Sequence, residues 1–434
     1  MQPLQIINLV FTIIFFVCYA YQLFYIPVSW FMAKKKKAPP APQDKKYAVL
    51  VCARNEEKVI GDLIDSLHTQ TYDVSKLTII VMADNCSDHT ADIAKDMGAI
   101  VYTRSNQKEI GKGYAMTELM KHIKEDFPKG FDGYFVFDAD NVLKSDYIEQ
   151  MNNAFALGYD VVTSYRNSKN YGDNMISAGS GLWFLRESRY LNHPRYLLNI
   201  SCAVSGTGYL MSQKKVDEIG GWPYHLLIED VEFSVNCMTK GEKIGYCADA
   251  EYFDEQPTKF GQSFRQRLRW ARGYLQILRH YGGKLIKGAF KGNFACADTF
   301  LNCSPIMILS ILSFLINIII PIIVAVQGDN VWIALESFAL LLVNMLSSIF
   351  LIGLITTISE WKKIRTTVFK KIWYTITFPF FIATYFPIVI VALFHKPQWK
   401  QIEHNVTVDD LRKKEKKNEL HDITHDNKPF EGKQ

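Results

Sequence analysis

Long stretches of this 434-residue chain contain no charged side chain. Asp, Glu, Lys and Arg are absent from residues 1–33, 299–328, 337–359 and 372–394. Each stretch is long enough to cross a bilayer as a helix, which takes roughly 20 apolar residues. Core helices of soluble proteins are commonly shorter. We therefore predict an integral membrane protein with one transmembrane helix at 1–33 and about three transmembrane segments over 299–395.

The N-terminal stretch also lacks the basic start and the Ala-x-Ala end of a signal peptide. Lys34–Lys37 follow it directly, and basic residues beside a membrane span stay in the cytoplasm. We expect a basic, proline-rich linker at 34–45 and a globular domain on the cytoplasmic face of the plasma membrane. The net charge of +5 suits anionic membrane lipids as partners, and no nucleic acid is needed to explain it.

The topology of the C-terminal part stays open at this point. The segment 396–434 is expected to be a charged, mobile, cytoplasmic tail because it is rich in Lys and Arg. Three spans after the globular domain would place this tail outside. Pro379 and Pro387 interrupt the last apolar stretch, so residues 372–395 either span the membrane or re-enter it.

Several cofactor and metal motifs are missing. The eight cysteines are scattered, with no Cys-x-x-Cys pair, which argues against a zinc site and a disulfide framework. No Gly-x-Gly-x-x-Gly follows the first predicted strand, which argues against NAD or FAD. The Gly-x-x-x-x-Gly-Lys-Ser/Thr loop of the P-loop hydrolases is also absent.

The polar region between the first and second apolar stretches, 46–258, alternates strand and helix patterns. The predicted strands are 46–53, 78–83, 99–103, 134–137, 160–164 and 243–248, and the predicted helices between them are 56–70, 87–97, 112–125 and 145–157. This alternation predicts a parallel sheet covered by helices on both faces. Ligands bind such sheets beyond the carboxyl ends of the strands.

Acidic residues follow two of these strands. Asp138 and Asp140 come directly after 134–137, where strand alternation would point both carboxylates the same way and let them hold Mg²⁺ or Mn²⁺. Asp84 ends another strand and is a candidate for hydrogen bonding a nucleobase or ribose. Lys112 opens a helix after Gly111, where phosphate groups commonly bind. The Asp138 and Asp140 pair alone is also compatible with a surface turn, and Lys112 between its two glycines with a flexible turn.

Two further motifs lie later in the chain. Glu229 and Asp230 begin a helix, where acidic residues are also favoured by the helix dipole. Gln266, Arg269 and Trp270 share one helix face at i, i+3 and i+4, and combine an amide, a phosphate-binding guanidinium and an aromatic platform. They belong to a basic amphipathic region, 259–298, which we expect to lie along the membrane surface.

In this order, and flanked by membrane spans, these motifs resemble the membrane-integrated family 2 glycosyltransferases. That family includes hyaluronan, cellulose and poly-N-acetylglucosamine synthases. The resemblance implies a GT-A fold, an α/β domain with a Rossmann-like mixed sheet, between transmembrane helices. It also implies inverting, metal-dependent transfer of a hexose or N-acetylhexosamine from a nucleotide-sugar donor, linked to UDP, to a growing polysaccharide. Accessory export proteins would then be further candidate partners.

The resemblance assigns donor-site roles residue by residue. The residues that match the family's nucleotide-binding motifs are Ala53, Asn55 and Glu56 in the first loop and Asp84 at the nucleobase. Lys112 and Asp138 match residues near the diphosphate, and Asp138 and Asp140 match the ligands of Mg²⁺ or Mn²⁺. Gln266, Arg269 and Trp270 match the residues around the pyrophosphate.

The resemblance also assigns the catalytic and acceptor residues. Asp230 matches the second carboxylate of the Thr-Glu-Asp motif and would be the general base, with Glu229 beside it. Ile228 replaces the threonine of that motif. Gly206 and Thr207 fall where relatives line the acceptor site, whose floor would be Trp270.

Three other functions compete with polysaccharide synthesis. The same enzyme class could add one sugar to a glycolipid or a polyprenyl phosphate, which are lipid-linked acceptors. A membrane scaffold or a nucleotide-sugar sensor with a decayed site is less favoured, because every acidic residue of the motifs is present. A transporter is disfavoured because so much of the chain forms a polar domain.

Overall fold

The computed structural model describes residues 3–32, 37–303, 305–327, 331–395, 397 and 402–410. Lys34–Lys36 of the predicted basic run and the tail beyond residue 410 lie outside the described residues. The strands are β1 (Tyr47–Ala53), β2 (Leu77–Asp84), β3 (Ile100–Arg104), β4 (Gly133–Phe137), β5 (Val142–Leu143), β6 (Val161–Ser168), β7 (Tyr209–Ser212) and β8 (Ile244–Asp254).

Helices precede, cover and follow these strands. They are α1 (Pro3–Phe31), α2 (Ile60–His68), α3 (Thr90–Asp96), α4 (Lys112–Asp126), α5 (Tyr147–Phe155), α6 (Met175–Glu187), α7 (His193–Leu197), α8 (Gln213–Ile219), α9 (Glu229–Thr239), α10 (Phe260–Phe290), α11 (Phe294–Cys303), α12 (Pro305–Val326), α13 (Val331–Ser359), α14 (Val368–Ala383) and α15 (Tyr385–Phe394), with a short 3₁₀ turn η2 (Val74–Lys76) and a π-helical turn η3 (Ser188–Asn192).

Within the described residues the strands form one mixed eight-stranded sheet in the order β3-β2-β1-β4-β7-β6-β8-β5. β1 pairs in parallel with both β2 and β4, whereas β7 runs antiparallel to β4 and β6. The predicted α/β mixed sheet is confirmed. The prediction of a sheet with only parallel strands, made from the strand and helix alternation, is wrong because β7 and the two-residue β5 were not recognised.

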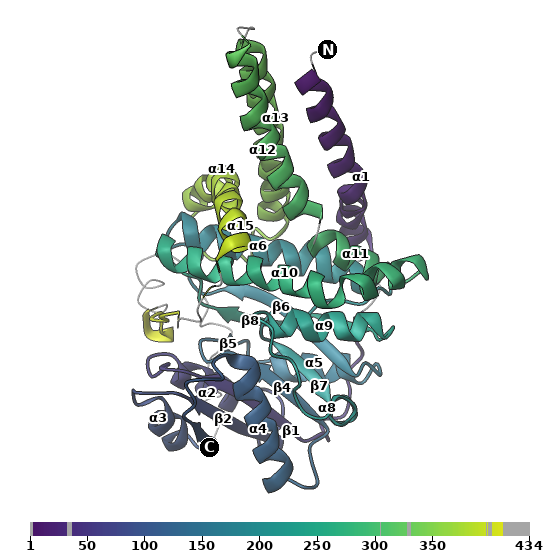
Figure 1. The fold of residues 1–434 in the computed structure, drawn as a ribbon. Helices are drawn as coiled ribbons and strands as arrows, with labels where there is room; N and C mark the ends of the chain where they lie inside the picture. Colours follow the sequence, from purple (N-terminus) through teal and green to yellow (C-terminus); the bar gives the residue numbers. More distant parts are fainter. Residues whose placement is uncertain are drawn as a thin grey trace.

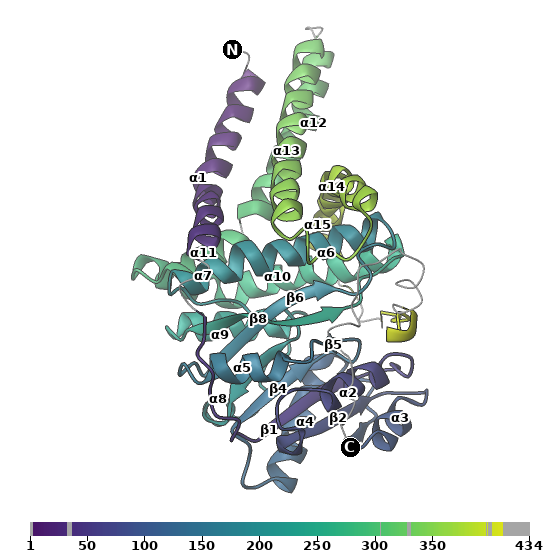
Figure 2. The ribbon, with the colours of Figure 1, turned by 180° about the vertical axis from the view of Figure 1, so that it is seen from behind.

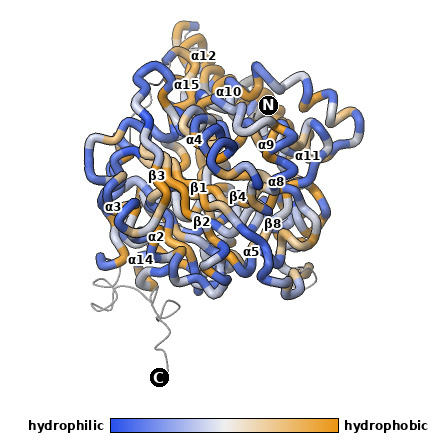
Figure 3. The backbone as a smooth tube through the Cα atoms, turned by 90° about the horizontal axis from the view of Figure 1, so that it is seen from below, coloured by the Kyte–Doolittle hydropathy of each residue, from blue (hydrophilic) through white to orange (hydrophobic). Residues whose placement is uncertain are grey.

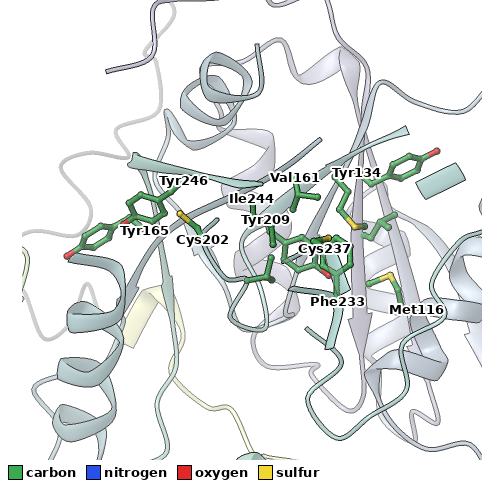
Figure 4. Packing of buried hydrophobic residues seen from close by; sticks show 14 of the residues in the cluster. Met116, Tyr134, Val161, Tyr165, Cys202, Tyr209, Phe233, Cys237, Ile244 and Tyr246 are labelled. Atoms are coloured by element: carbon green, nitrogen blue, oxygen red, sulfur yellow. The ribbon is translucent and has the colours of Figure 1, made fainter. Parts of the chain in front are cut away.

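Alternate residues of β1 face opposite layers of helices. Val49 and Val51 are fully buried in a cluster that includes side chains of α2 and α5. Ala48 and Leu50 are buried on the other face, in a cluster with side chains of α4, α6 and α9. The near-continuous apolar sequence of β1 follows from this two-sided burial. Figure 3 shows the apolar central strands surrounded by more polar helices, and Figure 4 shows part of the second cluster.

Apolar helices flank the sheet domain in the sequence and extend from one side of it. α1, α12 and α13 project together away from the sheet in both ribbon views (Figures 1 and 2). Among the described residues, Ile6–Phe31, Leu335–Ser359 and Val368–Phe394 are long and apolar enough to cross a membrane, and α12 contains a shorter apolar run, Ile311–Ile323. These helices are consistent with the predicted transmembrane helices on both sides of the domain.

The last apolar segment differs from the projecting helices. It is divided at Thr384 into α14 and α15, which lie beside α6 and α10 at the base of the projecting helices (Figures 1 and 2). The buried Arg267 of α10 donates from Nη1 to Thr384 Oγ1 at 2.6 Å and to the Phe381 carbonyl at 3.3 Å. The amphipathic helix α10 is thereby joined to the break between the two helices.

Candidate active site

The carboxyl end of β4 brings together four of the predicted residues. Asp138 forms an ion pair with Lys112 at the start of α4, and Lys112 Nζ also donates to the Gly206 carbonyl at 2.8 Å. The Asp138 amide donates to Thr207 Oγ1 at 2.8 Å. Thr207 is buried and Asp138 is half-buried. Thr207 thus supports Asp138, and its predicted acceptor role stays a prediction.

Gly206 adopts a backbone conformation that favours glycine. Its φ is +80°, and Gly208 two residues later has a φ of +68°. A Cβ on Gly208 would stand 2.2 Å from the ring of Tyr252. Both glycines are therefore required for the turn that presents the Gly206 carbonyl to Lys112.

Asp140 has a different environment from Asp138. Its Oδ2 accepts a hydrogen bond from the Glu255 amide at 2.8 Å, and the side chain is buried. Burial acts to raise the pKa of Asp140, but the positive charges of His404 and Lys169 and the Glu255 amide outweigh it and lower that pKa. Residues 138–141 form a turn, with the Asn141 amide donating to the Asp138 carbonyl at 3.1 Å, so strand alternation does not govern these two carboxylates.

The carboxylates of Asp138 and Asp140 suit a hard divalent cation in their chemistry. Carboxylate oxygens are preferred ligands of Mg²⁺, which usually keeps waters and substrate phosphates in the rest of its coordination shell. Among the described residues, no group of three or more His, Cys, Asp or Glu side chains is placed to hold a metal ion. Two protein carboxylates together with phosphate oxygens fit that chemistry.

The carboxyl end of β2 holds Asp84 in a buried ion pair. Arg104 Nη1, on β3, donates to Asp84 Oδ1 at 2.7 Å, and the same oxygen accepts from Asn85 Nδ2 at 2.9 Å. Both partners of the ion pair are less than a tenth exposed. Arg104 was not identified from the sequence, although it directly follows the predicted strand 99–103.

The loop after β1 is shaped by contacts to the loop after β2. Asn55 has a φ of +54°, and its Oδ1 accepts from the Ser87 amide at 2.7 Å. The Glu56 amide donates to Thr90 Oγ1 at 2.7 Å. Ala53 is buried at the end of β1. Ala53, Asn55 and Glu56 therefore belong to one ordered loop at the ligand-binding edge of the sheet.

Glu229 and Asp230 occupy the first turn of α9, next to positive charges. Burial raises the pKa of both carboxyls, that of Glu229 to about 7, and repulsion from Asp230 adds to the effect on Glu229. Lys112 and Arg269 act in the opposite direction on both. Glu232, the next acid of this turn, accepts instead from the His225 and Leu226 amides at 3.1 and 3.0 Å, and so fixes the preceding loop.

Helix α10 joins its predicted motif to this acidic turn. Arg269 Nη1 donates to the Leu227 carbonyl at 3.1 Å. A Cβ on Gly273 would lie 2.7 Å from Ile228 Cγ1, so the glycine allows α10 to approach the chain just before Glu229. Ile228 is buried there. Ile228, which stands in place of the family's threonine, therefore packs against α10.

The remaining two residues of the α10 motif face different surroundings. The Trp270 ring makes an edge-on contact with Phe184 of α6, with centroids 5.9 Å apart. Gln266 Oε1 is buried and has no hydrogen-bond partner among the described residues. A buried acceptor without a partner is costly in a folded protein and commonly marks a position completed by a ligand or water.

Other buried groups at the site were not found from the sequence. Arg166 on β6 donates from Nε to Asp254 Oδ2 at 2.8 Å, and its guanidinium lies 3.5 Å from the centroid of the Phe184 ring. His404 lies 2.9 Å from the Glu56 carboxylate. These partners are far apart in the sequence, so no local pattern could have revealed them.

Comparison with known proteins identifies the family. A family model described as glycosyltransferase like family 2 matches residues 42–273, more than half of the chain. The chain belongs to glycosyltransferase family 2. The family is named for the transfer of sugars, and the mixed α/β sheet of this chain is the GT-A-like domain that the resemblance implied.

Two curated relatives differ in the acceptor that their names state. A beta-monoglucosyldiacylglycerol synthase from Synechocystis sp. is 24% identical over 56% of this chain and 50% of its own length. A poly-beta-1,6-N-acetyl-D-glucosamine synthase from Staphylococcus aureus is 23% identical over 53% of this chain and 54% of its own length. The chain thus spans about half the length of each of these relatives.

A solved structure shares the fold over most of both chains. The mannosyltransferase PcManGT from Pyrobaculum calidifontis, in complex with GDP-Man and Mn²⁺, has a TM-score of 0.52 and 16% identity to this glycosyltransferase. The similarity covers 90% of this chain and 99% of the other. At this identity the likeness establishes the fold, and it does not establish the donor, the metal or the acceptor.

Proposed function

We propose that this glycosyltransferase moves a hexose or N-acetylhexosamine, with inversion, from a UDP-linked donor to a growing polysaccharide at the cytoplasmic membrane face. The observation that carries the proposal is the acidic pair of the buried Glu229 and the half-buried Asp230, which interacts electrostatically with Lys112 and Arg269. A base for the acceptor and cations for a leaving diphosphate are thereby held at one edge of the sheet.

In this mechanism Asp230 takes the proton from the acceptor hydroxyl as that oxygen attacks the anomeric carbon. Lys112 and Arg269 offset the negative charge on the departing diphosphate, which forms as its bond to the sugar breaks. The raised pKa of Asp230 suits a base, because a carboxylate with a higher pKa accepts a proton more readily. Trp270, whose ring packs edge-on against the buried Phe184, provides apolar surface for the acceptor sugar ring.

Asp138 and Asp140 are proposed to hold Mg²⁺ or Mn²⁺. The ion would neutralise charge on the donor diphosphate. The lowered pKa of Asp140 keeps this carboxylate ionised at neutral pH, as metal binding requires. Lys112 holds Asp138 before the donor arrives.

A lipid acceptor is a second candidate, and the projecting helices favour it. Asn8 of α1 donates from Nδ2 to Asn317 Oδ1 of α12 and to Ser337 Oγ of α13, each at 2.9 Å. All three side chains are buried. Their polar groups bond one another, so they join the helices and do not line a path for a polymer. A single addition to a glycolipid or polyprenyl phosphate needs no such path.

We also propose that α14 and α15 do not cross the membrane. Residues 402–410 lie against the sheet domain, so the chain between 298 and 402 must cross an even number of times. Crossings by α12 and α13 satisfy this condition, with α14 and α15 in the interface. This arrangement keeps both the sheet domain and the tail in the cytoplasm. Single cysteines at Asp329 and Glu403, in a chain without its native cysteines, test it: only Asp329→Cys should react with an impermeant reagent outside intact cells.

A donor screen tests the proposed function. Membranes containing the full chain are supplied with UDP- and GDP-linked sugars, with and without Mn²⁺, and the released nucleoside diphosphate is measured. The length of a radiolabelled product then separates the two acceptors, because a ladder supports a polysaccharide and a single product supports a lipid. Failure to release nucleoside diphosphate from every donor, with or without metal, would contradict both.

A further inference from the structure

The described part of the C-terminal tail packs against the ligand-binding edge of the sheet. A mobile tail was expected from its sequence, but residues 402–410 make specific contacts with the catalytic domain. Gln262 Nε2 of α10 donates to the Glu403 carbonyl at 3.1 Å, and the Val408 amide donates to Asp62 Oδ2 of α2 at 2.8 Å. Lys169 Nζ donates to the Val406 carbonyl at 3.3 Å. The end of this segment is the short yellow turn beside the sheet domain in Figures 1 and 2.

His404 is the side chain that this segment places in the site. Its Nδ1 lies 2.9 and 3.1 Å from the two carboxylate oxygens of Glu56, in the loop after β1. The Asn405 and Val406 amides donate to the Glu255 carboxylate, after β8, at 2.9 to 3.0 Å. The Glu255 amide in turn donates to Asp140. One segment therefore connects the loops after β1 and β8 with the predicted metal ligand.

The charges around His404 explain why this contact is favourable. Three carboxylates, those of Asp140, Glu56 and Glu255, act on the imidazole. Burial alone would lower its pKa, but the three acids outweigh burial and raise it to about 10. The imidazolium offsets negative charges that would otherwise repel one another in a buried place. Glu56 and His404 are both less than a fifth exposed, so solvent screens their interaction only weakly.

We propose that His404 is a positioning residue of the donor site, which holds the Glu56 carboxylate in place for the nucleotide sugar. The inference rests on the proposed function, because it takes Glu56 as a donor-binding residue. Residues 402–410 act as a strap that keeps the loops after β1 and β8 together while the donor binds.

Donor kinetics of the full chain in membranes test this role. His404→Ala should raise the KM for the donor about tenfold, the usual order for losing a hydrogen bond to a charged group, and change kcat by less than about twofold. His404→Asn should recover much of the loss, because the Asn Nδ2 group stands near the position of the imidazole Nδ1 and can donate to Glu56. His395→Ala, at an exposed histidine before the strap, is the matched control and should leave both constants unchanged.

A second variant loosens the strap away from the donor site. Asp62→Ala removes the acceptor of the Val408 amide and should raise the KM for the donor about threefold, since one hydrogen bond of the strap away from Glu56 is lost. This variant keeps the test decisive if His404→Ala accumulates poorly in membranes.

The possible results separate this inference from the proposed function. An unchanged donor KM in His404→Ala, or a lower kcat that His404→Asn does not recover, overturns the role of His404 while sugar transfer by the wild type stands. If the wild-type chain neither turns over nor binds any nucleotide sugar, the proposed function falls, and the role of His404 falls with it.

Discussion

Arg269 of α10 donates a hydrogen bond from Nη1 to the Leu227 carbonyl, 3.1 Å away and two residues before Glu229. The contact joins the helix that carries Gln266 and Trp270 to the turn that carries the acidic pair. Groups proposed to act on the diphosphate and on the acceptor hydroxyl are thus held relative to each other by protein contacts before substrate binds.

The acidic pair predicts the pH dependence of turnover. Its carboxyls have raised pKa values, about 7 for Glu229, so they hold a proton at pH values where ordinary carboxyls are ionised. A base must be deprotonated, and kcat should therefore fall in the acid range, at a higher pH than an ordinary Asp carboxyl would give. Arg269→Gln removes one of the positive charges that lower the pKa of Asp230, and should therefore shift this fall to higher pH. Nucleoside diphosphate release between pH 5 and 9 measures it, and an identical profile in the variant would refute the coupling.

Gly273→Ala should move the acidic turn. The new Cβ would lie within 3.0 Å of three Ile228 carbons, and such overpacking costs about 1–3 kcal/mol. A lower unfolding temperature and lower turnover are expected. Gly282→Ala on the same helix has no atom within 4 Å of its new Cβ and should stabilise the helix by about 0.5–1 kcal/mol. The double variant of Gly273→Ala with Ile228→Ala should recover activity. Equal effects of Gly273→Ala and Gly282→Ala would rule out the proposed close approach of α10 to Ile228.

Arg104→Met should impair donor binding through Asp84. The variant leaves a buried carboxylate without its ion pair, which costs about 3–5 kcal/mol of folding stability in comparable cases. The donor KM should rise as well. The double variant Asp84→Asn with Arg104→Met should lose less stability than the two single variants lose together. If their losses in thermal unfolding simply add, the two side chains act independently.

These residues also show the limits of prediction from sequence. The i, i+3, i+4 spacing of Gln266, Arg269 and Trp270 placed them correctly on one helix, because helical periodicity is a local property. Arg104 lies 20 residues from Asp84, and His404 lies 348 residues from Glu56. Such pairs depend on strand order and on the return of the tail, which local patterns do not encode.

The sheet shows the same division between local and long-range information. The apolar runs of β1, β2 and β4 identified these strands, since central strands buried on both faces have little polarity. The four residues of β7 follow a glycine-rich turn and carry no comparable run. The antiparallel pairing of β7 with β4 and β6 could therefore not be predicted from the alternation of strands and helices.

Chelation should abolish turnover if Asp138 and Asp140 hold a divalent cation. Treatment with EDTA should reduce nucleoside diphosphate release to background, and Mn²⁺ or Mg²⁺ should restore it. Asp140→Asn should need a higher Mn²⁺ concentration for half-maximal rate, because one anionic ligand is lost. Asp249→Asn, at an exposed surface ion pair with Lys37, is the control. Full activity of the wild type in EDTA would contradict the proposed metal dependence.

The most direct test of the proposed mechanism is turnover by Asp230→Asn, measured with the donor that the wild type uses. Removal of a general base commonly costs 10²–10⁴-fold, so kcat should fall by roughly that factor while the affinity for the donor stays within about twofold of wild type. Asn keeps the size of the side chain, and the proton acceptor alone is lost. Near wild-type turnover in Asp230→Asn would contradict the assignment of Asp230 as the base.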